Sequence, residues 1–329
     1  MDSAGDVPII DLSKLRGTSS ERSAAVQDVG RVCQEKGFFQ VINHGISTDI
    51  LRNALAAAAA FFSLPMDDRS ALASDDITLP VRYVTSSSAL DGGEVKVHRH
   101  VLKQYSYPLE KWIGNWPAKP SQYREKMGKY AREVRNKLVS DLMEAITESL
   151  GLGRYYLSSQ MENGFEMMLL SLYPPPPVSS GSDDLRCGDH TDYTFISVIL
   201  STHEGLEELD RVTGAWLAAP HRRGAEGGSP PPPPSLTVHV GDCLEAMSNG
   251  RYRAAVHRVL WGRGDTDTSR VSITSLTNWA MDESVEVAKE LVDDRHPTMY
   301  KGSTLRDYTR FLLAGRASGS TFLESLKIN

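Results

Sequence analysis

After about residue 160, the sequence breaks into short runs of apolar, β-branched and aromatic residues. Glycine, proline, aspartate and asparagine separate these runs, and such residues favour turns. Short strands with turn signals between them are typical of an antiparallel sandwich or barrel. The runs that carry this prediction are MMLLSLY, TFISVIL, SLTVHVGD, AAVHRVLW and RVSITSL.

Helical periodicity dominates the first half of the chain. Apolar and small residues recur at helical spacing in residues 20–35 and 49–62, and the longest helical pattern covers residues 120–151. GFFQVINHG, between the first two, predicts a buried strand, and VPIIDLSKL near the N-terminus predicts another. Residues 75–100 are polar and contain paired glycines, so we expect them to be irregular. A helical tail is expected at the end of the chain.

The length of 329 residues fits one enlarged domain. Within it we expect a mostly helical region over residues 1–155, a β-rich core over residues 156–285 and a helical tail over residues 286–329. Mixed α and β structure is therefore the predicted class. The prolines at residues 230–234 predict an exposed loop insertion. An ordinary surface loop explains these residues better than a segment that binds a partner protein.

Composition and charge exclude several classes of protein. The net charge is −6 and no long basic block occurs, so we expect no nucleic-acid partner. The longest apolar run, residues 54–62, is far too short to cross a membrane, and no signal peptide is visible. Cys33, Cys187 and Cys243 lie far apart and leave an odd thiol, which favours a reducing compartment. We therefore expect a cytoplasmic monomer with no membrane partner.

A histidine and an aspartate stand two positions apart in CGDHTDYTFISVIL. On a strand, His190 and Asp192 would point to the same face and could bind one metal ion side by side. A surface pair at the start of a strand would explain the same letters, since nine histidines make a chance match unremarkable. The pair alone leaves both interpretations open.

His257 lies in AAVHRVLW among branched apolar residues, and we expect it in the middle of a strand. A lone histidine of this kind is more often a core residue than a ligand. Together with His190 and Asp192, however, it completes a facial triad of two histidines and one carboxylate, which leaves positions open on iron(II). The same set also suits catalytic zinc.

Arg270 and Ser272 alternate in RVSITSL and would share one face of a strand. An arginine fork matches a carboxylate, and serine adds a donor; the alternative is a surface arginine on an edge strand. A buried, unpaired arginine would be costly, so it needs an anion. Tyr173 in LLSLYPPPP could offer a phenol to that anion or could be an ordinary core aromatic residue.

The order and spacing of these motifs resemble those of the plant-type soluble 2-oxoglutarate- and iron(II)-dependent dioxygenases. This group includes flavone synthase I, flavanone 3-hydroxylase and isopenicillin N synthase-like enzymes. The resemblance covers nearly the whole chain, because these segments occur in the family's order: VPIIDLSKL, GFFQVINHGI, FFSLP, YPPPP, GDHTDYT, GDCLEAMSNGRYRAAVHRV and RVSITSL. It implies a double-stranded β-helix, or jelly-roll, core with an N-terminal helical extension.

Six residues match the metal and cosubstrate positions of that family: His190, Asp192 and His257 for iron(II), and Arg270, Ser272 and Tyr173 for 2-oxoglutarate. The resemblance also implies dioxygen as a cosubstrate and ascorbate as a reductant. Three other positions depart from the family pattern. Ser171 and His239 replace asparagines that many members carry, and Leu276 replaces the usual aromatic residue, which puts part of the cosubstrate contacts in doubt.

Candidates for substrate choice lie after the metal motif, near Arg270 and in the polar segment: Phe195, Tyr83, Arg82, His98, Leu276 and Trp279. A core or surface position explains each of them at least as well. HRHVLKQYSYPLEKWIGNW and the tail FLESLKIN resemble the branch with flavone synthase I and salicylate hydroxylases. We therefore expect a small phenolic substrate, with desaturation or hydroxylation of a flavanone favoured. A salicylate or hormone hydroxylase is the alternative.

Two further classes of protein compete with this hypothesis. A zinc hydrolase would leave Arg270 and Ser272 without a role, and the sequence shows no clear general base for it. A non-catalytic small-molecule receptor on the same fold would not need the intact triad. Turnover that depends on iron and 2-oxoglutarate would distinguish the three.

Overall fold

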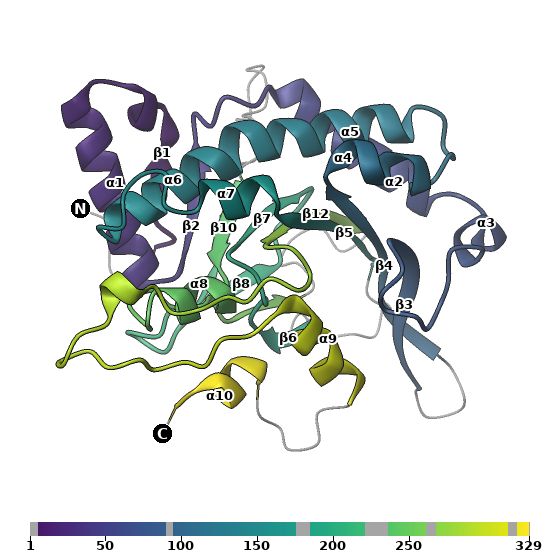
Figure 1. Ribbon diagram of the computed structural model, residues 1–329. Coiled ribbons are helices and arrows are strands. Elements are labelled where there is room, and N and C mark those ends of the chain that lie inside the picture. Colours follow the sequence, from purple (N-terminus) through teal and green to yellow (C-terminus); the bar gives the residue numbers. More distant parts are fainter. Residues whose placement is uncertain are drawn as a thin grey trace.

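A computed structural model describes residues 6–89, 95–175, 185–220, 236–260, 268–314 and 321–328. Two β-sheets form its centre (Figure 1). The larger has the strand order β1 (Ile9–Asp11), β2 (Phe38–Ile42), β10 (Leu236–Val240), β7 (Ile196–Ser201), β12 (Arg270–Asn278), β5 (Phe165–Tyr173), β4 (Val95–Tyr107) and β3 (Val81–Ala89). The smaller has the order β6 (Leu185–His190), β11 (His257–Leu260), β8 (Leu206–Leu209) and β9 (Trp216–Ala218).

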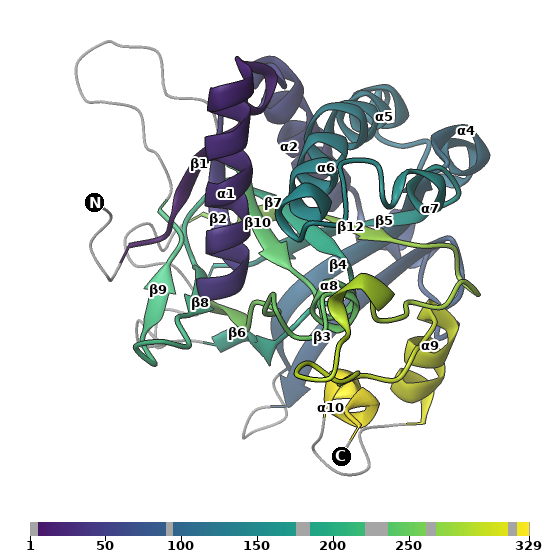
Figure 2. The same ribbon diagram turned by 60° about the vertical axis from the view of Figure 1, so that its left-hand side comes forward.

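Helices cover one face of the larger sheet, where Figure 2 shows α1, α2, α5 and α6 side by side. The N-terminal helices and 3₁₀ turns are η1 (Leu12–Arg16), α1 (Ser19–Glu35), α2 (Thr48–Phe62), α3 (Met66–Ser70), α4 (Leu109–Trp112) and η2 (Ile113–Asn115). A π-helical segment, η3 (Val134–Val139), joins α5 (Tyr123–Glu133) to α6 (Ser140–Ser149), and α7 (Ser158–Glu162) follows. The remaining elements are α8 (Asp242–Met247), η4 (Lys289–Leu291), α9 (Leu305–Leu313) and α10 (Phe322–Leu326).

The larger sheet presents two different faces because side chains alternate along each strand. On β12, Val271 and Ile273 pack into the core that the helices complete. Arg270 and Ser272 alternate with these two residues and point to the opposite face, toward the smaller sheet. A small apolar cluster fills the space between the two sheets at this end: Tyr173, Ile199, Leu206, Ala219 and Val259. The two facing sheets form the jelly roll that the sequence predicts, with polar residues enclosed between them.

Most of the predicted elements are confirmed. The helices expected over residues 20–35, 49–62 and 120–151, the strand within GFFQVINHG and the helical tail are all present. α1 begins at a capping box, in which the Thr18 side chain accepts from the backbone of Glu21 while the Glu21 carboxylate accepts from the backbone of Thr18. No helix in the described ranges is long and apolar enough to cross a membrane.

Two local predictions are wrong. Residues 75–100 are largely strand rather than irregular, since β3 and β4 form a long antiparallel hairpin there. β3 is the edge of the sheet, and its exposed Thr85, Ser86 and Ser87 make the segment look like a loop; polar residues on an edge strand also discourage pairing with other chains. In VPIIDLSKL, only Ile9–Asp11 is strand, because Asp11 caps a 3₁₀ helix by accepting from the Ser13 backbone at 3.0 Å. The prolines at residues 230–234 lie outside the described residues.

Candidate active site

His190, Asp192 and His257 come together between the two sheets. One ligand atom from each residue lies within 4.8 Å of the other two. His190 ends β6 and His257 begins β11, and the two are direct partners across the strand pair. The Nε2 atom of each histidine is 4.0 Å from an Asp192 carboxylate oxygen. Two imidazoles and one carboxylate on one side of a small space are the donor set of a facial iron(II) site.

The backbone brings this cluster together differently from the sequence-based expectation. His190 and Asp192 do not share a strand, because β6 ends at His190 and Asp192 lies in the following loop. His257 is the first residue of its strand rather than a middle one. The expected proximity is present, but the loop rather than the two-residue period of a strand turns the Asp192 carboxylate toward the histidines.

Backbone carbonyls hold both imidazoles in the tautomer that a metal needs. The Nδ1 atom of His190 lies 2.8 Å from the Gly188 carbonyl oxygen, and that of His257 lies 3.1 Å from the Ala255 carbonyl oxygen. A carbonyl can only accept, so Nδ1 carries the hydrogen in each ring. Nε2 is therefore the atom that each ring can offer to a metal, and in both rings it faces the Asp192 carboxylate.

The loop that carries Asp192 is held by a neighbouring turn. The Asp242 backbone N–H donates to the Asp192 carbonyl at 2.9 Å, and the Cys243 N–H donates to the Thr194 carbonyl at 3.0 Å. A Cβ atom at Gly241 would lie 2.2 Å from the same Thr194 oxygen, so glycine is needed for this close approach. The Ser197 hydroxyl donates to Asp192 Oδ2 at 2.6 Å, which fixes the carboxylate itself.

Burial and charge shift the pKa of each member of the cluster. Burial tends to raise the pKa of Asp192, but His257, His190 and the Ser197 hydroxyl together lower it, so the carboxylate is ionised. Burial and the neighbouring His239 lower the pKa of His257 to about 3. Burial also lowers the pKa of His190, but its contacts with Cys187 and Asp192 outweigh this effect and raise it to about 9. A metal ion that binds here must therefore displace the proton of His190.

A buried arginine, Arg270, lies on the facing sheet. Arg270 is only 1% exposed, and its Nε donates to the His203 carbonyl at 3.2 Å. Tyr173 is its direct partner across β12 and β5, and the Arg270 guanidinium carbon lies 5.3 Å from the centre of the Tyr173 ring. Ser272 is buried beside them. Arg270 and Ser272 therefore share a face, as predicted, and Tyr173 joins them.

The charge of Arg270 has no carboxylate at ion-pair distance among the residues that the structure describes. Tyr173 and, to a smaller extent, Glu208 favour its charged form without forming an ion pair with it. Burial lowers the pKa of Arg270, but an arginine remains charged at neutral pH. A buried cation without a paired anion costs free energy of folding, and an anion bound beside Arg270 would offset that cost.

Glu208 and His239 form a buried pair next to the metal cluster. Glu208 is the direct partner of His257 across β8 and β11, and its Oε1 lies 3.2 Å from Nε2 of His239. The His239 ring packs 4.4 Å from the His257 ring, centre to centre. Burial and the nearby Glu207 raise the pKa of Glu208 well above its ordinary value, and burial lowers that of His239 to about 4. The histidine that replaces the family asparagine is thus accompanied by a buried acid.

Comparison with known proteins identifies the family. Residues 7–119 match the family model described as non-haem dioxygenase in morphine synthesis N-terminal, and residues 164–278 match that of the 2OG-Fe(II) oxygenase superfamily. A rice protein named 2-oxoglutarate-dependent dioxygenase 21, chloroplastic, is 41% identical over 98% of this chain and 91% of its own length. The chain belongs to the 2-oxoglutarate- and iron(II)-dependent dioxygenases.

Other members of this dioxygenase family align over almost the entire chain. Rice flavanone 3-dioxygenase 3 is 38% identical over 98% of this chain and 93% of its own length. The crystal structure of a rice dioxygenase for auxin oxidation superposes with a TM-score of 0.78 at 25% identity, covering 98% of this chain and all of that one. The protein is therefore an oxidoreductase that uses iron(II) and 2-oxoglutarate, as predicted.

The residues predicted to select the substrate of this dioxygenase are scattered. Leu276 is the direct partner of Ser197, on the same face of β12 as Arg270. Phe195 and Trp279 pack together with ring centres 4.8 Å apart, both buried. These three apolar side chains come from the ends of β7 and β12.

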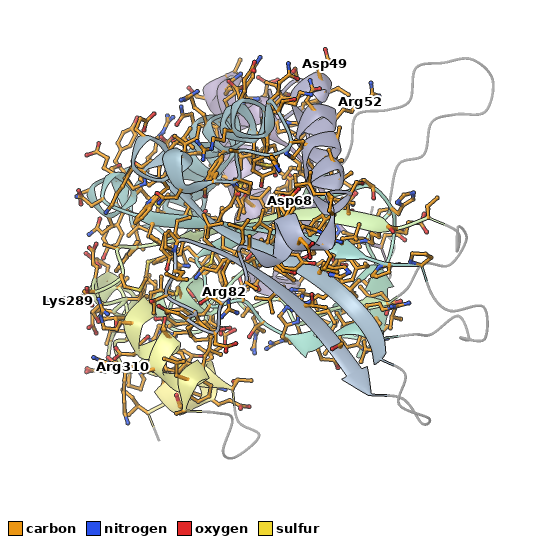
Figure 3. The ribbon with its side chains drawn as sticks, turned by 90° about the vertical axis from the view of Figure 1, so that its right-hand side faces the viewer. Asp49, Arg52, Asp68, Arg82, Lys289 and Arg310 are labelled. Atoms are coloured by element: carbon orange, nitrogen blue, oxygen red, sulfur yellow. The ribbon has the colours of Figure 1, made fainter. Side chains whose placement is uncertain are left out.

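The other three predicted substrate residues are placed differently. Tyr83 lies on the helix-covered face of the sheet, where its ring packs 6.4 Å from that of Phe61 and its hydroxyl contacts His100 Nδ1 at 2.7 Å. This face is separated from the metal cluster by the sheet itself. Arg82 lies on the β3–β4 hairpin (Figure 3), half-buried, with its guanidinium 3.4 Å from the Asp75 carbonyl. The side chain of His98 is outside the described residues.

Sequence reasoning missed Ser197, Glu208 and Arg99. Ser197 was hidden because its contact with Asp192 depends on a loop, for which no periodic pattern exists. Glu208 lies in an acidic strand segment, LEEL, that reads as exposed. Arg99 was missed because residues 75–100 are expected to be irregular; the observed strand β4 places it on the face opposite His100.

Proposed function

We propose that His190, Asp192 and His257 hold the iron(II) of this dioxygenase. The donor chemistry supports this role, because each histidine presents Nε2 and Asp192 is ionised beside them. Iron(II) held by three ligands keeps open positions, through which the family couples oxidation of 2-oxoglutarate to oxidation of a second molecule. The protein's own task is to fix the three ligands and exclude water from the space between the sheets.

Arg270, Ser272 and Tyr173 are proposed to bind the distal carboxylate of 2-oxoglutarate. The observation that carries this assignment is the buried Arg270 guanidinium, which lacks an ion-paired carboxylate within the described ranges. A planar fork matches a carboxylate in two hydrogen bonds. Ser272 and Tyr173 each offer one hydroxyl from neighbouring strands. A zinc hydrolase would have no use for such a group.

The proposed substrate is a small aromatic plant metabolite, with a flavanone favoured. The name of the rice flavanone 3-dioxygenase supports this choice through its 38% identity, and Leu276, on the face of β12 that carries Arg270, offers apolar surface to an aromatic ring. A salicylate or hormone hydroxylase is the second candidate, and the rice dioxygenase for auxin oxidation, at 25% identity, supports a hormone as the substrate.

A substrate panel tests these proposals. The purified enzyme with iron(II), 2-oxoglutarate and ascorbate is incubated with naringenin, other flavanones, salicylate, gibberellin precursors and indole acetate, and products are read by mass spectrometry. A flavanone product that lacks two hydrogens indicates desaturation, and one that gains an oxygen indicates hydroxylation. Turnover of salicylate or indole acetate without any flavanone product would replace the flavanone assignment with the hormone one.

Ser197→Ala is expected to weaken iron(II) binding by about 10- to 100-fold, the usual effect of removing a group that orients a metal ligand. The substitution removes the donor at 2.6 Å from Asp192 Oδ2 and leaves all three ligands in place. Anaerobic equilibrium dialysis with ferrous iron measures the effect. Ser201→Ala is the matched control, because Ser201 lies further along β7 on the same face as Ser197. Equal iron(II) affinity of the Ser197 and Ser201 variants would contradict the role of Ser197.

We also propose that the protein is a monomer located in the cytosol. Cys33, Cys187 and Cys243 are free thiols in the structure, and free thiols are compatible with a reducing compartment. The name of the rice relative at 41% identity carries a chloroplast location, so localisation of the tagged full-length chain decides between the two compartments.

A further inference from the structure

Arg99 is a second arginine at the proposed cosubstrate site. It lies on β4, one residue before His100, which is the direct partner of Leu172 on β5. Strand alternation therefore places Arg99 beside Tyr173, on the face that looks toward the smaller sheet. Its Nη1 donates to Cys187 Sγ of β6 at 3.3 Å. The half-buried side chain thus spans from one sheet to the other.

The hydrogen-bond partners of Arg99 are few. Besides the Cys187 sulfur, the Tyr173 phenol and the Asp192 carboxylate attract the guanidinium, and the register of β4 with β5 places Tyr173 directly across from Arg99. Within the part of the chain that the structure describes, no carboxylate pairs directly with Arg99. A thiol is a weak acceptor, so the phenol oxygen of Tyr173 is the better acceptor for Arg99.

The chemistry of these two groups determines the direction of a hydrogen bond between them. A guanidinium carries five N–H donors and no acceptor, so the Tyr173 oxygen must accept from Arg99. A phenol has a single O–H, which is then left to donate to another group. Arg270 lies across the same Tyr173 ring, with its guanidinium carbon 5.3 Å from the ring centre. Tyr173 on β5 therefore lies between Arg270 on β12 and Arg99 on β4.

We propose that Arg99 is a positioning residue for 2-oxoglutarate: by donating to the Tyr173 oxygen, it commits the Tyr173 hydroxyl hydrogen to the carboxylate that Arg270 holds. The proposal rests on the cosubstrate role assigned above to Arg270 and Tyr173. Without Arg99, the phenol can donate to other acceptors, and part of its contribution to cosubstrate binding is lost.

A double-mutant cycle tests this role through binding rather than turnover. Calorimetry measures the Kd of 2-oxoglutarate for the full-length chain loaded with Mn(II), which binds the same ligand types without turnover. Tyr173→Phe is expected to raise the Kd about tenfold, the effect of one hydrogen bond to a charged group. Arg99→Gln should raise it by about threefold to tenfold alone and by less than about twofold in the Tyr173→Phe background, because its effect passes through the hydroxyl.

Three variants make the outcome specific. Arg22→Gln removes a half-buried arginine that pairs with Glu148 at 2.6 Å, away from the site, and should leave the Kd unchanged. Arg99→Lys keeps donors and charge and should recover part of the affinity; it also replaces Arg99→Gln if that variant fails to fold. Arg270→Gln tests the site itself, and an unchanged Kd there would overturn the proposed cosubstrate site.

If Arg270→Gln weakens binding, the result for Arg99 stands by itself. An unchanged Kd for Arg99→Gln overturns the positioning role. An equal loss in the wild-type and Tyr173→Phe backgrounds also overturns it, because Arg99 would then act on an anion directly. In that case, the equal rise in the Kd of 2-oxoglutarate identifies the cosubstrate itself as that anion.

Discussion

His257→Ala is expected to abolish succinate formation and to weaken iron(II) binding by more than about 100-fold. This loss is larger than that expected when a residue that only hydrogen-bonds a metal ligand is removed. The substitution removes one of three ligand atoms that lie within 4.8 Å of one another. The two remaining ligands cannot hold the facial geometry on which open coordination positions depend. Anaerobic dialysis with ferrous iron and a succinate assay measure the two losses.

Two variants separate loss of the ligand from loss of the fold. His296→Ala removes an exposed histidine that contacts Asp293 at 2.9 Å and should keep full iron affinity. Asp192→Asn keeps the size of the side chain but removes its charge, so its effect should be comparable with that of His257→Ala. If His257→Ala retained iron-dependent succinate release, the metal would be held elsewhere in the chain.

Local periodicity explains why part of this site was predictable. Arg270 and Ser272 are two residues apart on one continuous strand, so the alternation of side chains places them on one face without knowledge of the fold. The grouping of the three metal ligands was also predictable from their order, although the reason given for His190 and Asp192 was not correct. Their proximity depends on a loop anchored by backbone hydrogen bonds from Asp242 and Cys243.

Contacts between distant parts of the chain could not be predicted in the same way. The Glu208–His239 pair joins residues 31 positions apart on different sheets, and its formation depends on how the two sheets face each other. Tyr83 shows the converse case. The sequence alone does not show which face of β3 the Tyr83 side chain occupies, because a shift of one residue in strand register moves the side chain to the other face. The register with Leu102 places it among the helices.

Arg270→Met is expected to raise the KM and the Kd of 2-oxoglutarate on the order of 100-fold, corresponding to about 3 kcal/mol for the loss of a charge-assisted fork. Arg270→Lys keeps the charge but cannot form two parallel hydrogen bonds, so an intermediate loss of about tenfold is expected. Iron(II) affinity measured without 2-oxoglutarate should stay unchanged, because Arg270 lies on a different sheet from the proposed metal ligands. Arg270 begins β12, whereas His190 ends β6, Asp192 follows β6 and His257 begins β11.

Stability provides the control that most active-site substitutions lack. Arg270 is 1% exposed, and among the described residues no carboxylate pairs directly with it. Its charge therefore costs free energy in the folded state without cosubstrate, and an apolar side chain of similar length removes that cost. The midpoint of thermal unfolding of Arg270→Met should therefore equal or exceed that of the parent enzyme. Arg124→Gln is the control. It loses a hydrogen bond to the Trp116 carbonyl and should be no more stable than the parent.

Added 2-oxoglutarate should raise the unfolding midpoint of the parent enzyme but not that of Arg270→Met, since only a chain that binds the ligand is stabilised by it. A large drop in the midpoint of Arg270→Met would mean that Arg270 is held by contacts within the chain, and the unpaired charge would then no longer point to a cosubstrate.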